Sequence, residues 1–159
     1  MIDPAPLIRL VGADEYVRLR EVRLHALAYA DHLAEHLARE AGADQHFWRE
    51  RTRKAAAGDT MATFVATQLD AFVGVVDGFL SDDGRAVEVG GMWVDPVVRR
   101  TGIGRSLLTA ISTWASARGA ERLALWVRYE NHPARLLYER EGFEVTKRQK
   151  LGVRLERPL

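Results

Sequence analysis

The chain has 159 residues, of which 47% are hydrophobic and 28% charged, and its formal net charge is +1. This length and composition are typical of one folded domain, expected to span residues 1–159, and they exclude a largely disordered chain. The near balance of 23 basic and 22 acidic residues argues against nucleic acid or a membrane surface as the main partner. Cys is absent, which excludes disulfides, thiolate metal sites and a Cys nucleophile. There is no membrane-spanning apolar run and no signal-peptide layout at the start, so a cytoplasmic location is expected.

The first third of the chain predicts a short strand and three helices. Apolar residues recur at helical spacing in three successive segments, and Gly42 and Gly58 can end the second and the third. The predicted elements are a strand at 7–11 and helices at 13–30, 31–41 and 44–57.

The remaining two thirds predict a sheet. Segments rich in Val, Phe and Thr flank a short turn at 68–70, which indicates a hairpin. The continuous apolar run 123–127 is typical of a parallel strand that is buried on both faces. The predicted elements are strands at 61–67, 71–80 and 85–95, a helix from Ile103 that stops at Gly119, a strand at 123–127, a helix at 133–140 and two closing strands from Phe143 onward. This order predicts an α+β domain, with a mixed sheet flanked by helices and one strand–helix–strand crossover at its centre.

A glycine-containing loop lies between a predicted strand and a predicted helix, at residues 99–106. A helix start has unpaired N–H groups and a partial positive charge, which suit an anion. Gly102 and Gly104 remove Cβ atoms that would hold a phosphate away, and three arginines add charge, so pyrophosphate is the expected ligand. The alternative is a solvated helix start with two turn glycines. A dinucleotide-binding fingerprint is excluded, because it needs Gly or Ala where Leu107 stands.

Two further features have unusual spacing. Asn131, Arg135 and Tyr138 lie at i, i+4 and i+7, so they share one helix face. Without other information, Asn131 reads equally well as a helix cap and Tyr138 as a core residue. The pair Gly90-Gly91 within a strand indicates a bulge or a close backbone approach.

The loop R-x-x-G-x-G and the downstream run N-x-x-A-x-x-L-Y-x-x-x-G-F, at 131–143, together resemble the GNAT superfamily of acyl-CoA-dependent N-acetyltransferases. The resemblance implies a mostly antiparallel sheet with one splayed parallel strand pair. It also implies acetyl-CoA as cosubstrate, coenzyme A as product and a small-molecule or protein amine as acceptor. The pantetheine arm would enter the gap and pair with strand backbone, the loop would hold the pyrophosphate and Asn131 a pantetheine amide. The cofactor-binding residues that it implies are Met92, Val94, Arg99, Arg100, Thr101, Gly102, Ile103, Gly104, Arg105, Ser106, Asn131 and Tyr138.

The resemblance also suggests the groups that move protons. Deprotonating a primary amine of pKa near 10.4 costs about 4.6 kcal/mol at pH 7, and the leaving thiolate needs a proton. Tyr138 matches the usual general acid of the family, and Glu88 is the expected general base, acting through desolvation or a water relay. Glu130 is the second candidate for the base, and an exposed strand carboxylate without a catalytic role is the other reading of Glu88.

The acceptor site is expected between the first two helices and the last hairpin. Tyr29, His32 and Glu35 are the expected substrate-binding residues. Because residues 150–154 leave little room for a long final loop, the acceptor cleft is expected to be open or completed by a second subunit of a homodimer. Further candidates for the acceptor site are Asp31, His36, Phe47 and Trp48.

Two rival functions come from other classes. His32, Glu35 and His36 match the H-x-x-E-H pattern of zinc hydrolases, although the sequence offers no third ligand. The other reading of this segment is a polar helix face, and the expected metal content is therefore none. The second rival is a domain that binds acyl-CoA as a sensor without transferring the acyl group.

Overall fold

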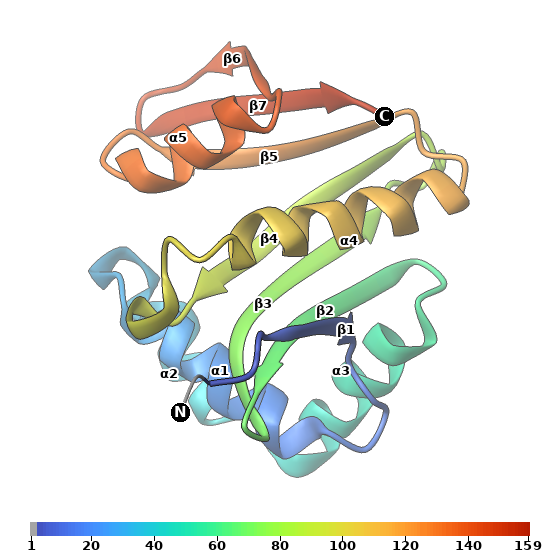
Figure 1. Ribbon diagram of the computed structural model, residues 1–159, viewed down its shortest axis with the longest axis vertical. Helices are drawn as coiled ribbons and strands as arrows, with labels where there is room; N and C mark the ends of the chain where they lie inside the picture. Colours follow the sequence, from blue (N-terminus) through green and yellow to red (C-terminus); the bar gives the residue numbers. More distant parts are fainter. Residues whose placement is uncertain (1–2) are drawn as a thin grey trace.

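The computed structural model describes residues 3–159 and shows a seven-stranded sheet with helices on both faces (Figure 1). The elements, in chain order, are β1 (Leu7–Leu10), α1 (Tyr16–Ala28), the 3₁₀ turn η1 (Asp31–Leu33), α2 (Ala34–Ala41), α3 (Gln45–Ala57), β2 (Met61–Gln68), β3 (Ala71–Leu80), β4 (Ala86–Val94), the 3₁₀ turn η2 (Pro96–Val98), α4 (Ile103–Ala117), β5 (Arg122–Arg128), α5 (His132–Arg140), β6 (Glu144–Arg148) and β7 (Gly152–Pro158). Within residues 3–159, no helix is both long enough and apolar enough to cross a membrane.

The sheet has the strand order β1-β2-β3-β4-β5-β7-β6. The β4–β5 pair is parallel and the other five neighbouring pairs are antiparallel. This confirms the predicted mixed α+β architecture with its central crossover. The β2–β3 hairpin turns on Leu69 and Asp70, whose φ angles are 48° and 64°, as a two-residue turn that follows the strand twist requires.

The helix boundaries follow from local capping. Asp44 caps α3 by accepting a 2.9 Å hydrogen bond from the Phe47 amide, and Gly58 ends that helix in the left-handed region at φ 66°. The first helix begins at Tyr16 rather than at residue 13, because the Glu15 carboxylate accepts the Gly12 N–H at 2.7 Å and holds a turn there. The segment predicted as one helix at 31–41 begins as a 3₁₀ turn and becomes α-helical at Ala34.

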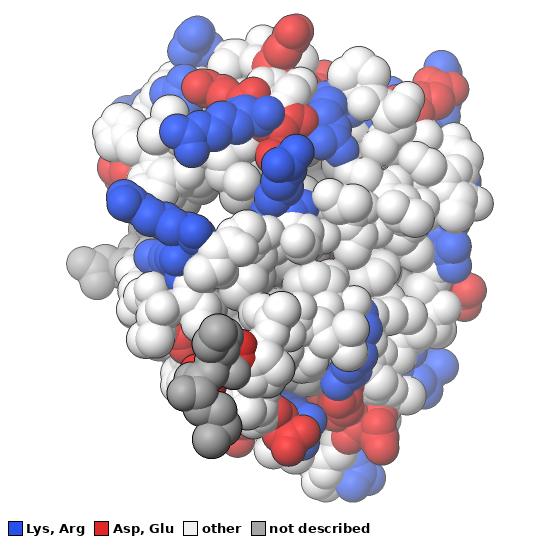
Figure 2. All heavy atoms as spheres, viewed as in Figure 1, with Lys and Arg blue, Asp and Glu red and all other residues white. Residues whose placement is uncertain are grey.

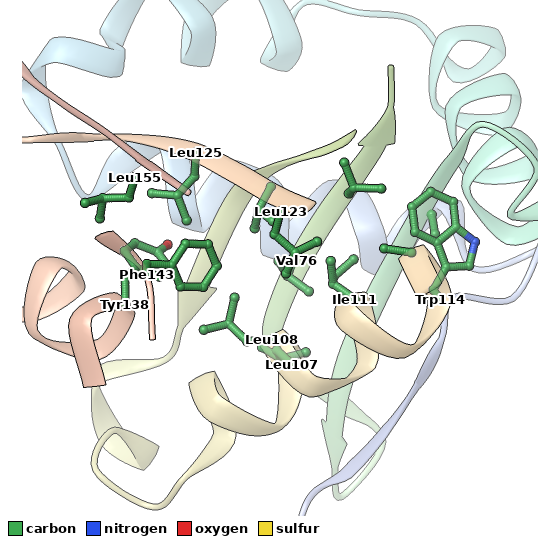
Figure 3. Close-up of a cluster of buried hydrophobic side chains, with 14 of the residues drawn as sticks. Val76, Leu107, Leu108, Ile111, Trp114, Leu123, Leu125, Tyr138, Phe143 and Leu155 are labelled. Carbon is green, nitrogen blue, oxygen red and sulfur yellow. The ribbon is translucent and has the colours of Figure 1, made fainter. Parts of the chain in front are cut away.

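The two faces of the sheet bury different clusters. Gly74 on β3 makes room for α4, since a Cβ there would lie 3.1 Å from Ile103 Cγ2. Its neighbour Val75 points to the opposite face and packs against α1 with Leu19 and Val22. The α4 face holds the larger cluster, which extends over β5, β7 and α5 (Figure 3). The largest side chains of that cluster are Ile103, Leu107, Leu108, Ile111, Trp114, Leu123, Leu125, Tyr138, Phe143 and Leu155.

The prediction that β5 is buried on both faces is wrong at Trp126. Its side chain is 45% exposed, whereas Leu125 and Val127 are buried. Helices α1 and α3 pack mainly on β2, β3 and β4, and neither covers β5 extensively. The Trp126 ring is partly covered by the guanidinium of Arg154, whose Cζ lies 5.8 Å from the ring centre.

Replacing Gly152 with Ala is expected to lower the free energy of unfolding by about 3 kcal/mol or more. A Cβ at this position would lie 2.2 Å from the carbonyl oxygen of Val127, a backbone atom that is fixed by the β5–β7 pairing. Urea denaturation of the two proteins measures the difference. Gly90→Ala is the control, because a Cβ there would make an ordinary 3.6 Å contact with Phe79 Cε2 and Gly90 does not have a positive φ. Equal stability of the Gly152 variant and the parent would contradict the geometry.

Candidate functional site

Strands β4 and β5 separate after a short parallel contact. They pair from Ala86 opposite Arg122 to Glu88 opposite Ala124, and no further pair follows. Strand β5 continues alongside β7 as far as Arg128, while β4 turns away, so the two strands diverge (Figure 1). The remainder of β4 therefore has a free edge that faces a gap in the sheet, as a splayed parallel pair requires.

A bulge in β4 lies directly beyond the point of separation. Val75 pairs with Trp93 and Asp77 with Gly90, so one residue of β3 stands opposite two of β4. Gly91 adopts φ 58°, which confirms the bulge predicted from the double glycine. The extra residue reverses the alternation of the strand, so Trp93 packs against α1.

Met92 and Val94 present backbone groups to the gap. The Asp95 amide donates to the Val73 carbonyl at 2.9 Å and so points toward β3. Because N–H and C=O groups alternate in direction along a strand, those of Met92 and Val94 point away from β3. The Val94 carbonyl accepts a 2.8 Å hydrogen bond from Arg99 Nε.

The loop before α4 forms a set of unpaired amides. Gly102 is the N-cap in the left-handed region at φ 87°, and no side chain caps this end of the helix. No acceptor among the described residues receives the N–H groups of residues 100–105. This is the arrangement that binds phosphate at helix starts. Gly104 has a second reason to lack a side chain, since a Cβ there would lie 3.0 Å from Leu137 Cδ2 on α5.

The same region is hollowed on the surface. Figure 2 shows an opening between α5 and the segment that leads into α4, and basic side chains border it. Arg105 pairs with Glu141 at 3.2 Å, while Arg100 has no ion pair within residues 3–159 and adopts φ 63°. Arg99 differs from the expectation: its amide donates to the Pro96 carbonyl at 3.4 Å and its side chain turns toward Val94 and Tyr29. Of the three arginines, Arg99 alone contributes neither a free amide nor its side chain to this cradle.

Helix α5 positions Asn131 and Tyr138. Asn131 is the N-cap, and its side-chain oxygen accepts the Ala134 N–H at 3.4 Å. The Tyr138 ring packs against Phe143, with centroids 5.6 Å apart (Figure 3), and burial raises the pKa of the phenol to about 12. The hydroxyl makes no hydrogen bond to a described residue. Tyr138 is 7% exposed, and its hydroxyl oxygen is not among the fully enclosed unpaired polar atoms, so the oxygen keeps a small exposed surface.

Glu88 is held by a cation from another strand. Both of its carboxylate oxygens accept from Arg154, one of them from Nη1 at 3.3 Å, and this bond raises the pKa of the Arg154 guanidinium. The Arg154 guanidinium thus occupies both oxygens of Glu88, although the Glu88 side chain is 43% exposed. The pKa of the Glu130 carboxyl is lowered, first by a hydrogen bond from its own backbone amide and then by the Arg128 side chain. Glu130 is therefore a weaker base than an ordinary carboxylate.

Comparison with known proteins agrees with this geometry. Residues 23–143 match the acetyltransferase (GNAT) family. The chain belongs to this family. Membership makes it an acyltransferase, and no curated protein matches the sequence.

Solved structures share the GNAT fold over nearly the whole chain. The PaiA N-acetyltransferase from Thermoplasma acidophilum, in complex with coenzyme A, is 13% identical with a TM-score of 0.84, covering 98% of this chain and 100% of that one. A GNAT acetyltransferase from Streptococcus pneumoniae is 19% identical with a TM-score of 0.82, covering 97% and 99%. AAC(6')-Iy, in complex with the bisubstrate analogue CoA-S-monomethyl-acetylneamine, is 19% identical with a TM-score of 0.73, covering 93% and 97%.

A hollow in this GNAT chain lies where α1 approaches the end of β4. It has a volume of about 300 Å³ and is lined by His25, Ala28, Tyr29, Trp93, Asp95 and Pro96. Tyr29 is one of the residues that the sequence predicts for the acceptor site, whereas His25 and Trp93, which line the same hollow, are not among them. The signal for His25 is its i, i+4 spacing from Tyr29 on one helix. Trp93 carried no such signal, because the bulge decides which face it occupies.

The other expected acceptor residues lie farther along the chain. His32 is exposed in η1, close enough to Glu130 for its charge to contribute to the lowered pKa of that carboxyl. Glu35 is exposed on α2. Phe47 is 40% exposed on α3, but Trp48 is only 1% exposed and belongs to the packed interior, so its expected acceptor role is wrong. The side chain of Asp31 lies outside the described part.

The zinc reading finds no support in this GNAT fold. Among the residues that the structure describes, no group of three or more His, Asp or Glu side chains comes together as a metal site. His36 is instead bonded through Nδ1 to Arg39, at 2.7 Å.

Proposed function

We propose that the protein transfers an acetyl group from acetyl-CoA to a primary amine. The observation that carries this proposal is the row of unpaired amides at 100–105 beside the gap between β4 and β5. A phosphate-binding helix start next to a free strand edge suits a ligand with a diphosphate at one end and an amide-containing arm at the other. Coenzyme A has this shape, and it is bound in the solved PaiA structure.

The proposed binding mode uses the parts that face the gap. The diphosphate accepts from the amides of residues 100–105, with charge supplied by Arg100 and Arg105. The pantetheine arm pairs with the backbone groups of Met92 and with the Val94 N–H, since the Val94 carbonyl already accepts from Arg99. Asn131 uses its oxygen as the α5 cap, and its side-chain nitrogen remains to donate to a pantetheine carbonyl. The acyl carbonyl then lies near the bulge, where a backbone N–H can polarise it.

The proposed reaction is direct attack. The amine nitrogen forms a bond to the thioester carbon, and the carbon–sulfur bond breaks to give the amide and coenzyme A. Tyr138 donates a proton to the departing sulfur, because its phenol is neutral at rest and its oxygen keeps a small exposed surface. The amine loses its proton to Glu88, through water or after the Arg154 pair loosens. Tyr29, His32 and Glu35 remain the proposed acceptor contacts.

Calorimetric titration with coenzyme A tests the first half of this proposal. We expect binding by the parent protein and about tenfold weaker binding by Gly102→Ala, because an L side chain in the left-handed region costs about 1–2 kcal/mol and displaces the amides. Thiol release from acetyl-CoA across a panel of amines tests the second half. Absence of coenzyme A binding would end the proposal. Binding without thiol release from any amine would favour the acyl-CoA sensor instead.

A further inference from the structure

Arg99 is fixed at the acceptor side of the gap. Its Nε donates to the Val94 carbonyl at 2.8 Å, and its guanidinium carbon lies 5.3 Å from the centre of the Tyr29 ring. Neither terminal nitrogen bonds to another residue between 3 and 159, and the side chain forms no ion pair there. Arg23, Arg51 and Arg154 each pair with a carboxylate. The Arg99 guanidinium is therefore fixed in place, and its two terminal nitrogens have no acceptor among residues 3–159.

An aromatic hollow adjoins this guanidinium. The Tyr29 ring meets the Trp93 ring edge-on, with centroids 5.9 Å apart, and His25 lies 6.5 Å from Trp93. These side chains line the hollow of about 300 Å³ between α1 and the end of β4. Asp95 is the acidic group on its wall, and it already accepts the Val97 N–H at 3.0 Å as the cap of η2. The hollow thus suits an apolar or aromatic group, and the Arg99 guanidinium beside it suits an anion.

We propose that the acceptor is an α-amino acid with an apolar or aromatic side chain, whose carboxylate binds Arg99 and whose side chain enters this hollow. The inference rests on the proposed acetyl transfer. A guanidinium fork matches a carboxylate with two parallel hydrogen bonds, and the Tyr29 ring holds the fork in place. Because Arg99 is anchored on the free edge of β4, a carboxylate bound there brings the adjacent amine to the strand along which the thioester is proposed to lie.

This assignment moves the Arg99 side chain from the cofactor to the acceptor. It differs from the sequence-based expectation, in which Arg99 holds the pyrophosphate, and the two alternatives predict different kinetic effects. An acceptor contact affects KM for the amine, whereas a diphosphate contact affects KM for acetyl-CoA. Arg100 provides the comparison, because it is the next residue and belongs to the proposed cradle.

The test compares phenylalanine with 2-phenylethylamine, which has the same ring and amine but no carboxylate. Thiol release from acetyl-CoA is measured for the parent, Arg99→Gln and Arg100→Gln, with the surface variant Arg53→Gln as the neutral control. We expect kcat/KM to favour phenylalanine by at least about tenfold in the parent, as a bidentate carboxylate contact allows. In Arg99→Gln that preference should fall below about twofold while KM for acetyl-CoA stays within about twofold. In Arg100→Gln the preference should remain and KM for acetyl-CoA should rise.

Several results would overturn the inference. One is equal use of the two amines by the parent, and another is an Arg99→Gln variant that loses only acetyl-CoA affinity. A third is an enzyme that acetylates uncharged or polycationic amines but neither phenylalanine nor 2-phenylethylamine. That result would refute the inference and leave the proposed function intact. If no amine in the wider panel releases thiol, the proposed function itself fails, and the inference fails with it.

Discussion

Tyr138→Phe is expected to lower kcat for acetyl transfer by about 100-fold or more, with coenzyme A affinity nearly unchanged. The substitution keeps the ring that packs on Phe143 and removes a hydroxyl that makes no hydrogen bond to a described residue. A lower kcat would therefore reflect the loss of the proton donor and not a change in packing. Steady-state thiol release and calorimetric titration with coenzyme A measure the two quantities separately.

The pH dependence gives an independent check on the same group. Burial raises the pKa of Tyr138 to about 12, so its acid form persists well above pH 10. We expect no fall in kcat between pH 8 and 10 from loss of this proton, although an ordinary phenol would begin to lose it near pH 10. Tyr16→Phe is the matched control, since Tyr16 lies at the surface near Gln45 and Arg49. Unchanged turnover in the Tyr138 variant would remove this residue from the mechanism.

Gly91→Ala is expected to weaken coenzyme A binding by at least about tenfold and to lower the free energy of unfolding by about 2–3 kcal/mol. The residue has φ 58°, and a Cβ would lie 2.7 Å from Arg23 Nη1 and 2.8 Å from Asp77 Oδ2. Neither side chain can easily yield. Arg23 is held by the buried Glu40 at 3.2 Å, and Asp77 is held by Arg51 at 3.1 Å and by Thr63 at 2.5 Å.

Gly90→Ala is the control for Gly91→Ala, because it adds the same methyl group to β4 without disturbing the bulge. A Cβ at Gly90 would lie 3.6 Å from Phe79 Cε2, an ordinary contact, and Gly90 does not have a positive φ. This variant should keep both its stability and its coenzyme A affinity. Calorimetry and urea denaturation of the two alanine variants, side by side, measure the effect. Equal behaviour of the two would show that the bulge does not position the proposed arm-binding edge.

The features predicted correctly from the sequence depend on neighbouring residues. The end of the third helix at Gly58 and the hairpin turn at 68–70 each follow from residues within a few positions, because capping and turn geometry are local. The double glycine and the R-x-x-G-x-G loop are equally local. They therefore indicated both the bulge and the helix start in the right places.

The missed features join distant parts of the chain. Glu88 and Arg154 lie 66 residues apart, and nothing near either one signals that β7 brings them together. The exposure of Trp126 depends on how far α1 and α3 extend across the sheet, which a five-residue apolar run does not reveal. The direction of the Arg99 side chain is likewise set by Tyr29, which lies on another element.

Because the contact between β4 and β5 is short, the stability of the fold depends on whether a molecule is bound in the gap between them. Beyond Glu88 the edge of β4 that faces β5 has no strand paired with it, although β3 still pairs with the other edge, so the sheet is interrupted at its centre. A molecule that fills the gap binds only the folded chain, and at 100 times its dissociation constant it adds about 2.7 kcal/mol to stability. In a cell, the lifetime of this chain against proteolysis and edge-to-edge aggregation would then rise and fall with the supply of that molecule.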